Sequence, residues 1–296
     1  MPHARRFSAT PYLFILPGML FFLVFLLYPL VEAFRISLYD WKIMPGAVST
    51  FVGLDNYLRA FKDDVFWIAL RNTVLYTVVT VPAQMVLAML VAVLVDALPS
   101  GKVLYRTLYY IPVITSWVVV SLLFRYLFDP SEAGLINYFL MHGLHLIAQP
   151  IPWLREPGPA MVAIITLGVW KGIGWSMIIF LAALQTIPAD LHEASQIDGA
   201  SPVQRFFSIT LPLMRPTVVF VLIMLVIGGF NIFLSVYLMT GGNPLHRTET
   251  ILTYMYNQAF NFLEFGYGAA LSYLLAIIIF VISFVQIKFL RHPIEV

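Results

Sequence analysis

Eight polar or aromatic residues interrupt otherwise apolar runs and are the candidates for contact with a small solute. Amides, hydroxyls and an ammonium can hydrogen-bond to a polar molecule, and aromatic rings can stack against it. The candidates are Asn72, Tyr76, Gln84, Trp170, Lys171, Trp175, Asn231 and Ser235. Asn231 and Ser235 are four positions apart, so we expect them to share one face of a helix. At each position an alternative stays open, because such groups also bond neighbouring membrane helices or mark the membrane interface.

The sequence lacks the residue sets that catalysis, metal binding or nucleotide hydrolysis require. It contains no G-x-x-x-x-G-K-[ST] phosphate loop, so it cannot bind ATP by that route. With no cysteine and six scattered histidines, it offers no metal-ligand spacing. No histidine–carboxylate–nucleophile set is apparent, nor a relay of carboxylates within the apolar runs. We therefore expect a chain that is not an enzyme and that binds no metal or cofactor itself.

Composition places the chain in a membrane. Hydrophobic residues make up 60% and charged residues 11%, whereas a soluble domain is about 45–50% apolar and about 25% charged. The mean hydropathy is +0.88. A net charge of +2 without a basic patch gives no reason to expect nucleic acid as a partner, and lipid is the expected surrounding.

Six apolar runs are each long enough to cross a bilayer, because about 20 helical residues span its core of about 30 Å. The expected spans are residues 12–38, 72–94, 107–128, 160–185, 217–239 and 266–290. Pro17 and Pro29 are expected as kinks in the first span, and Pro112 as the interruption of the third. Residues 134–147 could form an amphipathic helix on the membrane surface. The predicted fold class is an all-α membrane protein with six transmembrane helices, in one domain comprising residues 1–296.

An even number of spans puts both termini on one side of the membrane. The 17 Lys and Arg divide equally between the two sides, apart from Lys171 within the fourth span. The side that carries the termini is built of shorter segments, with cations close to the helix ends, where the positive-inside rule applies. We therefore expect the termini, and the segment 187–216 on the same side, to be cytoplasmic.

The segment 187–216 is a polar island between the fourth and fifth spans. A short helix is expected from Asp190 to Ile197, followed by a turn at Gly199 that suits a positive φ. Ser201 and Gln204 have the spacing of a capping box, with a proline between them at the first helical position. A second short helix should follow, ended by prolines at 212 and 216. From spacing alone, an ordinary helical connection is more common than a docking element.

The residues of this island resemble the cytoplasmic signature of binding-protein-dependent ABC importer permeases. That pattern is Glu-Ala-Ala, three residues, Gly, nine residues and Ile-x-Leu-Pro. Here the sequence has Glu193-Ala194-Ser195, then Gly199, then residues 209–212 as Ile-Thr-Leu-Pro, with every gap matched. Ser195 departs from the second alanine of the pattern but is also small.

The resemblance extends over almost the whole chain and favours the sugar-importing branch, of the maltose and glycerol-phosphate type. It is carried by FVGLDNY at 51–57, GVWKGIGWSMIIFLAALQTIP at 168–188 and MTGGNP at 239–244. It implies the type I ABC importer permease fold in a bacterial inner membrane, crossed several times, with both termini cytoplasmic.

The resemblance also implies a function and a set of partners. The chain would translocate a sugar or sugar derivative by alternating access, together with a second related permease. An extracytoplasmic solute-binding protein would deliver the solute, and a cytoplasmic dimer of ABC ATPases would bind ATP and Mg²⁺. The island, residues 187–216, would be the coupling-helix loop, with Glu193, Ala194, Ser195, Asp198 and Gly199 against the ATPase. The alternatives are an ATP-independent channel or secondary carrier for a small polar solute and, less favoured, a membrane-embedded enzyme.

Overall fold

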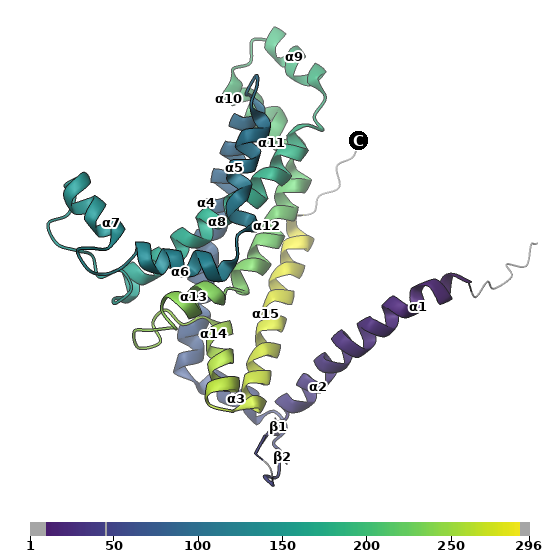
Figure 1. Cartoon of the computed structure of the whole chain (residues 1–296). Coiled ribbons are helices and arrows are strands. Elements are labelled where there is room, and N and C mark those ends of the chain that lie inside the picture. Colours follow the sequence, from purple (N-terminus) through teal and green to yellow (C-terminus); the bar gives the residue numbers. More distant parts are fainter. Residues whose placement is uncertain (1–9, 45, 291–296) are drawn as a thin grey trace, which may run out of the picture. The chain divides into compact units, whose positions relative to one another are not determined.

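Long apolar helices make up most of the structure, a computed structural model that describes residues 10–44 and 46–290 (Figure 1). Among these residues, five helical runs are long and apolar enough to cross a membrane: Leu13–Ser37, Asp64–Asp96, Pro157–Leu184, Arg215–Met239 and Phe265–Leu290. The bent pair α5 (Lys102–Ile114) and α6 (Trp117–Leu127) makes a sixth if it is one span. The prediction of an all-α, six-span protein is therefore confirmed.

The described residues fall into two compact units. The first comprises the described parts of residues 1–62 together with 255–274, and the second comprises 63–254 with the described part of 275–296. Helix α15 (Phe265–Leu290) belongs partly to each unit. That residues 1–296 act as one permease domain stays a prediction.

In the first unit, the N-terminal helical run continues through both of its prolines. It consists of α1 (Thr10–Phe22), a π turn η1 (Leu23–Leu27) and α2 (Tyr28–Ser37). Pro17 lies inside α1 and Pro29 in the first turn of α2, and a π turn is one way for a helix to accommodate such a residue. The side chains from Leu13 to Val31 are exposed in this structure, and an apolar helix of this length requires lipid or protein around it.

The connection after α2 is folded. Strands β1 (Tyr39–Asp40) and β2 (Thr50–Phe51) pair antiparallel, and α3 (Asp55–Lys62) follows. The Asn56 amide donates to the carbonyls of Ser37 and Tyr39, at 2.8 and 3.1 Å. The FVGLDNY motif therefore fixes the end of α2.

In the second unit, α4 (Asp64–Asp96) and α8 (Pro157–Leu184) form the central helix pair. Helices α5, α12 (Arg215–Phe230) and α13 (Leu234–Met239) pack around it. The boundary with the first unit falls within α14 (Ile251–Tyr256), and the π turn η4 (Asn257–Asn261) belongs to the first unit. Two apolar clusters hold this unit together. One includes Phe124 and Leu167, and the other includes Ala88, Met177 and Phe180. Between them along α4 and α8 lies a polar stretch, described below.

The third span is broken, but not where the sequence predicted. Pro112 lies inside α5, and the chain turns by 92° between α5 and α6 instead. Thr115 is extended, and Ser116 caps α6 by accepting from the amide of Val118 at 3.3 Å. Pro112 removes only the one hydrogen bond that its own N–H would make to the carbonyl four residues earlier, whereas a new N-cap defines where the next helix starts.

The expected surface helix at 134–147 is much shorter. Helix α7 (Leu135–Tyr138) passes into a π turn η2 (Phe139–Gly143), and the chain then leaves the helical conformation. The buried Asn137 organises this connection instead. Its amide nitrogen donates to three backbone carbonyls, and its oxygen accepts from the amide of Ile151 and the indole of Trp153. Such a side-chain hub cannot be recognised from spacing.

Candidate functional site

A polar cavity of about 270 Å³ lies between helices α4, α5, α6, α8 and α12. Helix α4 contributes Tyr76, Thr80 and Gln84, and α8 contributes Lys171 and Trp175. The other lining residues are Val113, Trp117, Gly168, Gly172, Met224, Leu225, Gly228 and Gly229. Four of the eight predicted solute-contact residues, Tyr76, Gln84, Lys171 and Trp175, therefore meet in one cavity. A hydroxyl, an amide and two indoles are groups that bind polyhydroxylated molecules.

Glycines on α8 bring its backbone against the polar side chains of α4. A Cβ atom on Gly168 would lie 2.1 Å from the Tyr76 hydroxyl, and one on Gly172 would lie 2.1 Å from Oε1 of Gln84. The Gln84 amide donates to the Gly168 carbonyl at 3.1 Å. The cavity wall is thus formed by side chains of α4 that lie directly on the backbone of α8.

Lys171 is 3% exposed, and its ammonium is occupied by backbone oxygens. Nζ donates to the carbonyls of Pro112 and Thr115, at 2.6 Å each, and lies 3.5 Å from that of Val113. The ring centroid of Trp117 is 4.8 Å from the same nitrogen. These carbonyls form the C-terminal end of α5, where the helix dipole favours a positive charge.

The other four predicted residues lie outside this cavity. The buried Asn72 donates to the carbonyls of Arg247 and Glu249, at 2.9 Å each, and so holds the loop after α13. Trp170 is 41% exposed and packs against Phe124, with 5.4 Å between ring centroids.

The prediction that Asn231 and Ser235 share a helix face is wrong. The fifth span breaks between α12 and α13, and Asn231 caps the end of α12. Its exposed side chain donates to the Ile227 carbonyl, while Ser235 is buried in α13. The helical periodicity on which the prediction rested does not hold across the break.

Sequence reasoning missed Thr80 and the small residues of the cavity wall. A Cβ on Gly229 would meet Thr77 Oγ1 at 2.7 Å, so α12 also approaches α4 closely. Pairs of small residues facing polar positions on another span are typical of close contacts between membrane helices, and were the available signal. No signal in the sequence indicated the carbonyl partners of Lys171, since they lie 56 to 59 residues away.

The polar island folds largely as its residues predict. Helix α9 (Ala189–Ile197) is followed by Gly199 with φ +77°, the left-handed region that favours glycine. Ser201 and Gln204 form the predicted capping box of α10 (Pro202–Arg205), with Pro202 in its first turn. The small Ser195 is buried in α9, and its hydroxyl donates to the carbonyl of His192 at 2.8 Å.

Pro212 does not end the second helix, contrary to the prediction. After α10 the chain forms a π turn η3 (Phe206–Thr210) and a further helical turn α11 (Leu211–Leu213) that contains Pro212. A π turn shifts the hydrogen-bond register by one residue and so accommodates a residue without an N–H. The helical path from the island therefore continues almost to the start of α12 at Arg215.

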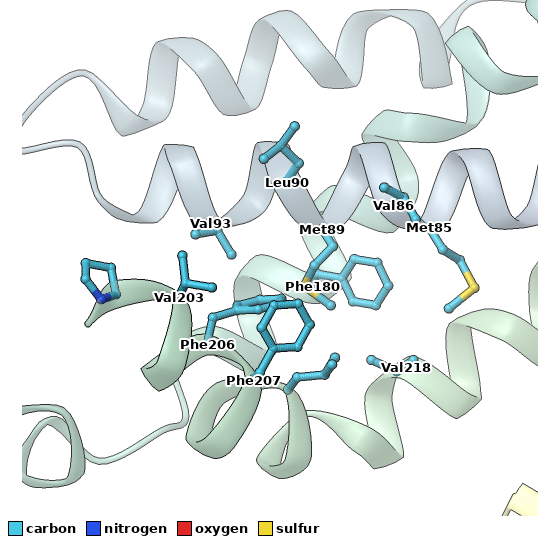
Figure 2. A pocket seen from close by; sticks show the side chains of 12 residues that line it. Met85, Val86, Met89, Leu90, Val93, Phe180, Val203, Phe206, Phe207 and Val218 are labelled. Carbon is cyan, nitrogen blue, oxygen red and sulfur yellow. The ribbon is translucent and has the colours of Figure 1, made fainter. Parts of the chain in front are cut away.

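An apolar groove of about 610 Å³ separates the island's second helix from the spans (Figure 2). Val203, Phe206 and Phe207 point from the island toward Met89 and Phe180 of α4 and α8 in Figure 2. The two phenylalanine rings contact each other edge to face, with centroids 5.1 Å apart. The island's aromatic side chains therefore face helices α4 and α8, which also line the cavity.

Residues 70–289 match the family described as "Binding-protein-dependent transport system inner membrane component". The chain belongs to this family. It is thus the inner-membrane permease component of a transport system, as the signature at Glu193–Pro212 predicted. Cavity and island lie within the matched residues.

Named relatives agree with this membership. The chain is 37% identical to the arabinooligosaccharides transport system permease protein AraP of Bacillus subtilis (strain 168), covering 95% of this chain and 88% of the relative. It is 36% identical to the lactose transport system permease protein LacF of Rhizobium radiobacter, covering 95% and 94%. The sn-glycerol-3-phosphate permease protein UgpA of Yersinia pestis is 32% identical, covering 99% of both chains. The fold is similar to a chain of a bacterial ABC transporter that imports the acidic polysaccharide alginate, with TM-score 0.80, 23% identity and 95% of each chain covered.

Proposed function

We propose that this chain is a permease subunit of an ATP-driven importer for a neutral sugar or oligosaccharide. The observation that carries the proposal is the lining of the cavity. Among the described residues it combines indole rings, a phenol and an amide, and its ammonium is occupied by carbonyls at the end of α5. Relatives named for arabinooligosaccharides and for lactose support a sugar as solute.

Charge favours a neutral over an anionic sugar. An anion is bound most strongly by a cation with free donors, but the three N–H groups of Lys171 all have carbonyl acceptors nearby. The negative end of the α5 dipole offsets much of the remaining charge. Lys171 is thus expected to shape the cavity and not to bind a carboxylate or phosphate.

The island would receive the force that drives transport. Glu193, Ala194, Ser195, Asp198 and Gly199 are proposed to contact a cytoplasmic ABC ATPase dimer, which would bind ATP and Mg²⁺ in place of this chain. The proposal is supported by the left-handed turn at Gly199 and by the aromatic side chains that face α4 and α8. If the island contacts the ATPase, the island and both termini are proposed to be cytoplasmic.

The remaining partners follow from the family. An extracytoplasmic solute-binding protein would deliver the sugar, and a second related permease would complete the pathway from the other side. The exposed Asn231, at the end of α12, stays a candidate for the wall that the two permeases share. Asn72 and Ser235 have a weaker claim because their side chains are buried, and Trp170 has one because it packs against Phe124.

Transport by the reconstituted complex tests the proposal. The chain would be purified with its associated permease and ATPase, placed in liposomes, and supplied with the cognate binding protein. ATP-dependent uptake of neutral mono- and oligosaccharides is expected to exceed uptake of sugar phosphates and uronates. Uptake that persists without ATP would instead indicate a channel or secondary carrier, and preferred uptake of an anionic sugar would overturn the assignment of a neutral solute.

A further inference from the structure

Helix α8 connects the island with the cavity, the two features on which the proposed function rests. Its last residue, Leu184, precedes the start of α9 at Ala189 by five positions, and its middle carries Lys171 into the cavity. Lys171 and Leu184 are 13 positions apart, which corresponds to about 20 Å along the helix at about 1.5 Å per residue. A displacement of the island would therefore reach the cavity along one continuous helix.

Lys171 attaches α8 to the break in the third span. Its ammonium donates to Pro112 and Thr115 on the α5 side, and its nitrogen lies over the ring of Trp117, the first residue of α6. A single cation thus contacts both arms of the 92° bend. The carbonyls at the end of α5 have no intrahelical partner, and within a membrane such groups must be satisfied by the protein itself.

A second contact next to Lys171 keeps α8 and α5 together. A Cβ atom on Gly174 would lie 2.0 Å from the carbonyl oxygen of Tyr109, so the two backbones touch at this point. Backbone contact restrains translation of one helix against the other, while the ammonium satisfies the carbonyls of Pro112 and Thr115 on the α5 side of the bend. The GVWKGIGW stretch at 168–175 therefore supplies both the contact with α5 and the cap for its end.

We propose that Lys171 is a positioning residue of the transport cycle. Its ammonium ties α8 to the break between α5 and α6, so that motion of the island moves the broken span and, with it, the Val113 and Trp117 wall of the cavity. This inference rests on the proposed function, since it requires that the island be driven by an ATPase. In this role Lys171 does not bind the solute but transmits motion to the cavity wall.

Removing and then restoring the ammonium tests the proposal directly. Because the chain has no cysteine, Lys171→Cys can be alkylated at one position, provided that its partner subunits are also made cysteine-free. Bromoethylamine converts that side chain into a lysine isostere with the same number of non-hydrogen atoms, and bromopropane gives a neutral isostere. The readout is the number of ATP molecules hydrolysed per solute taken up, with the KM for solute measured alongside.

The unmodified variant should hydrolyse ATP but transport poorly, so that its ATP-to-solute ratio rises about tenfold, within the usual range of coupling between sites. The amine should restore the ratio and the propyl group should not, with the KM for solute unchanged. Lys102→Met is the matched control, because Lys102 also caps a helix end, donating to the Asp96 carbonyl at 2.5 Å, but lies outside the cavity lining. It should keep the wild-type ratio.

Several results would overturn the role of Lys171. One is a wild-type ATP-to-solute ratio in Lys171→Cys. Another is a ratio restored equally by bromoethylamine and bromopropane. The third is a change in the KM alone, which would assign the ammonium to solute binding. If the cysteine variant does not assemble, the ATP-to-solute ratio of Lys171→Arg is compared with that of the wild type instead. A planar guanidinium keeps the charge but does not converge on three carbonyls, so a raised ratio is expected and a wild-type ratio contradicts the proposal. Absence of ATP-dependent uptake in the wild type would count against the proposed function instead.

Discussion

Gly174 and Tyr109 bring the backbones of α8 and α5 into direct contact, because any Cβ at position 174 would lie 2.0 Å from the Tyr109 carbonyl oxygen. A backbone atom cannot swing aside as the end of a side chain can. The two helices must therefore separate, or α5 must bend further, to accept even a methyl group.

Gly174→Ala is expected to destabilise the protein by about 1–3 kcal/mol, the usual cost of overpacking. The melting temperature in detergent should fall by about 2–4 °C for each kcal/mol. Gly158→Ala is the matched control on the same helix, since nothing lies within 4 Å of a Cβ there. Equal melting temperatures for the two variants would show that α8 and α5 are not in backbone contact.

Asn72→Leu should loosen the loop after α13. The amide of Asn72 donates to the carbonyls of Arg247 and Glu249, and leucine keeps the approximate volume but removes both bonds. Each buried acceptor left unsatisfied costs about 1–3 kcal/mol. Amide hydrogen exchange between residues 243 and 253 should become faster, as measured by mass spectrometry.

Asn231→Leu serves as the control for this exchange experiment, because Asn231 donates only within its own helix end, to the Ile227 carbonyl. The same loop should exchange at the wild-type rate in that variant. If both variants exchange alike, Asn72 does not hold the loop, and its place among the solute-contact candidates would regain weight.

The elements that could be predicted from sequence are those specified by local chemistry. Apolar runs gave the spans, and Ser201 with Gln204 gave the capping box of α10. Gly199 gave a turn that only a residue tolerant of positive φ adopts without strain. In each case the signal and the structure lie within a few residues of each other.

The predictions that failed depended on partners distant in sequence or on breaks in helical periodicity. Asn231 and Ser235 were paired by helical spacing, which ends where α12 ends. The third span turns after Thr115, where Lys171 of another helix satisfies the carbonyls that the turn leaves free. Four of the eight predicted solute-contact residues line the cavity. Polar side chains within apolar spans need a cavity or a partner, but the sequence does not say which of the two each has found, and contact with a solute stays a prediction.

Gly199→Val should uncouple ATP hydrolysis from uptake while the protein still inserts into the membrane. A left-handed conformation costs an ordinary residue about 1–2 kcal/mol, and a β-branched side chain disfavours it further. At φ +77° the turn between α9 and α10 is therefore expected to reopen. Copurification of the ATPase, or uptake per ATP hydrolysed, should fall.

Ala200→Val provides the control for this turn, because Ala200 is the next residue and its φ is not positive. This variant also introduces valine but does not require the left-handed region, so it should couple ATP hydrolysis to uptake as the wild type does. Normal coupling in Gly199→Val would remove this turn from the transmission path.

Ser195→Ala, which restores the second alanine of the family signature, should leave both stability and coupling within about 0.5 kcal/mol of the wild type. The Ser195 hydroxyl donates only to the His192 carbonyl, three residues earlier in the same helix, so no contact between elements is lost. Ser195→Leu should be damaging, because this side chain is 8% exposed and a larger one has no room. Thermal melting measures the effect of each variant on stability, and uptake per ATP hydrolysed measures its effect on coupling. A loss of coupling in Ser195→Ala at unchanged melting temperature would mean that the hydroxyl itself contacts the ATPase, and that small size alone is not what position 195 requires.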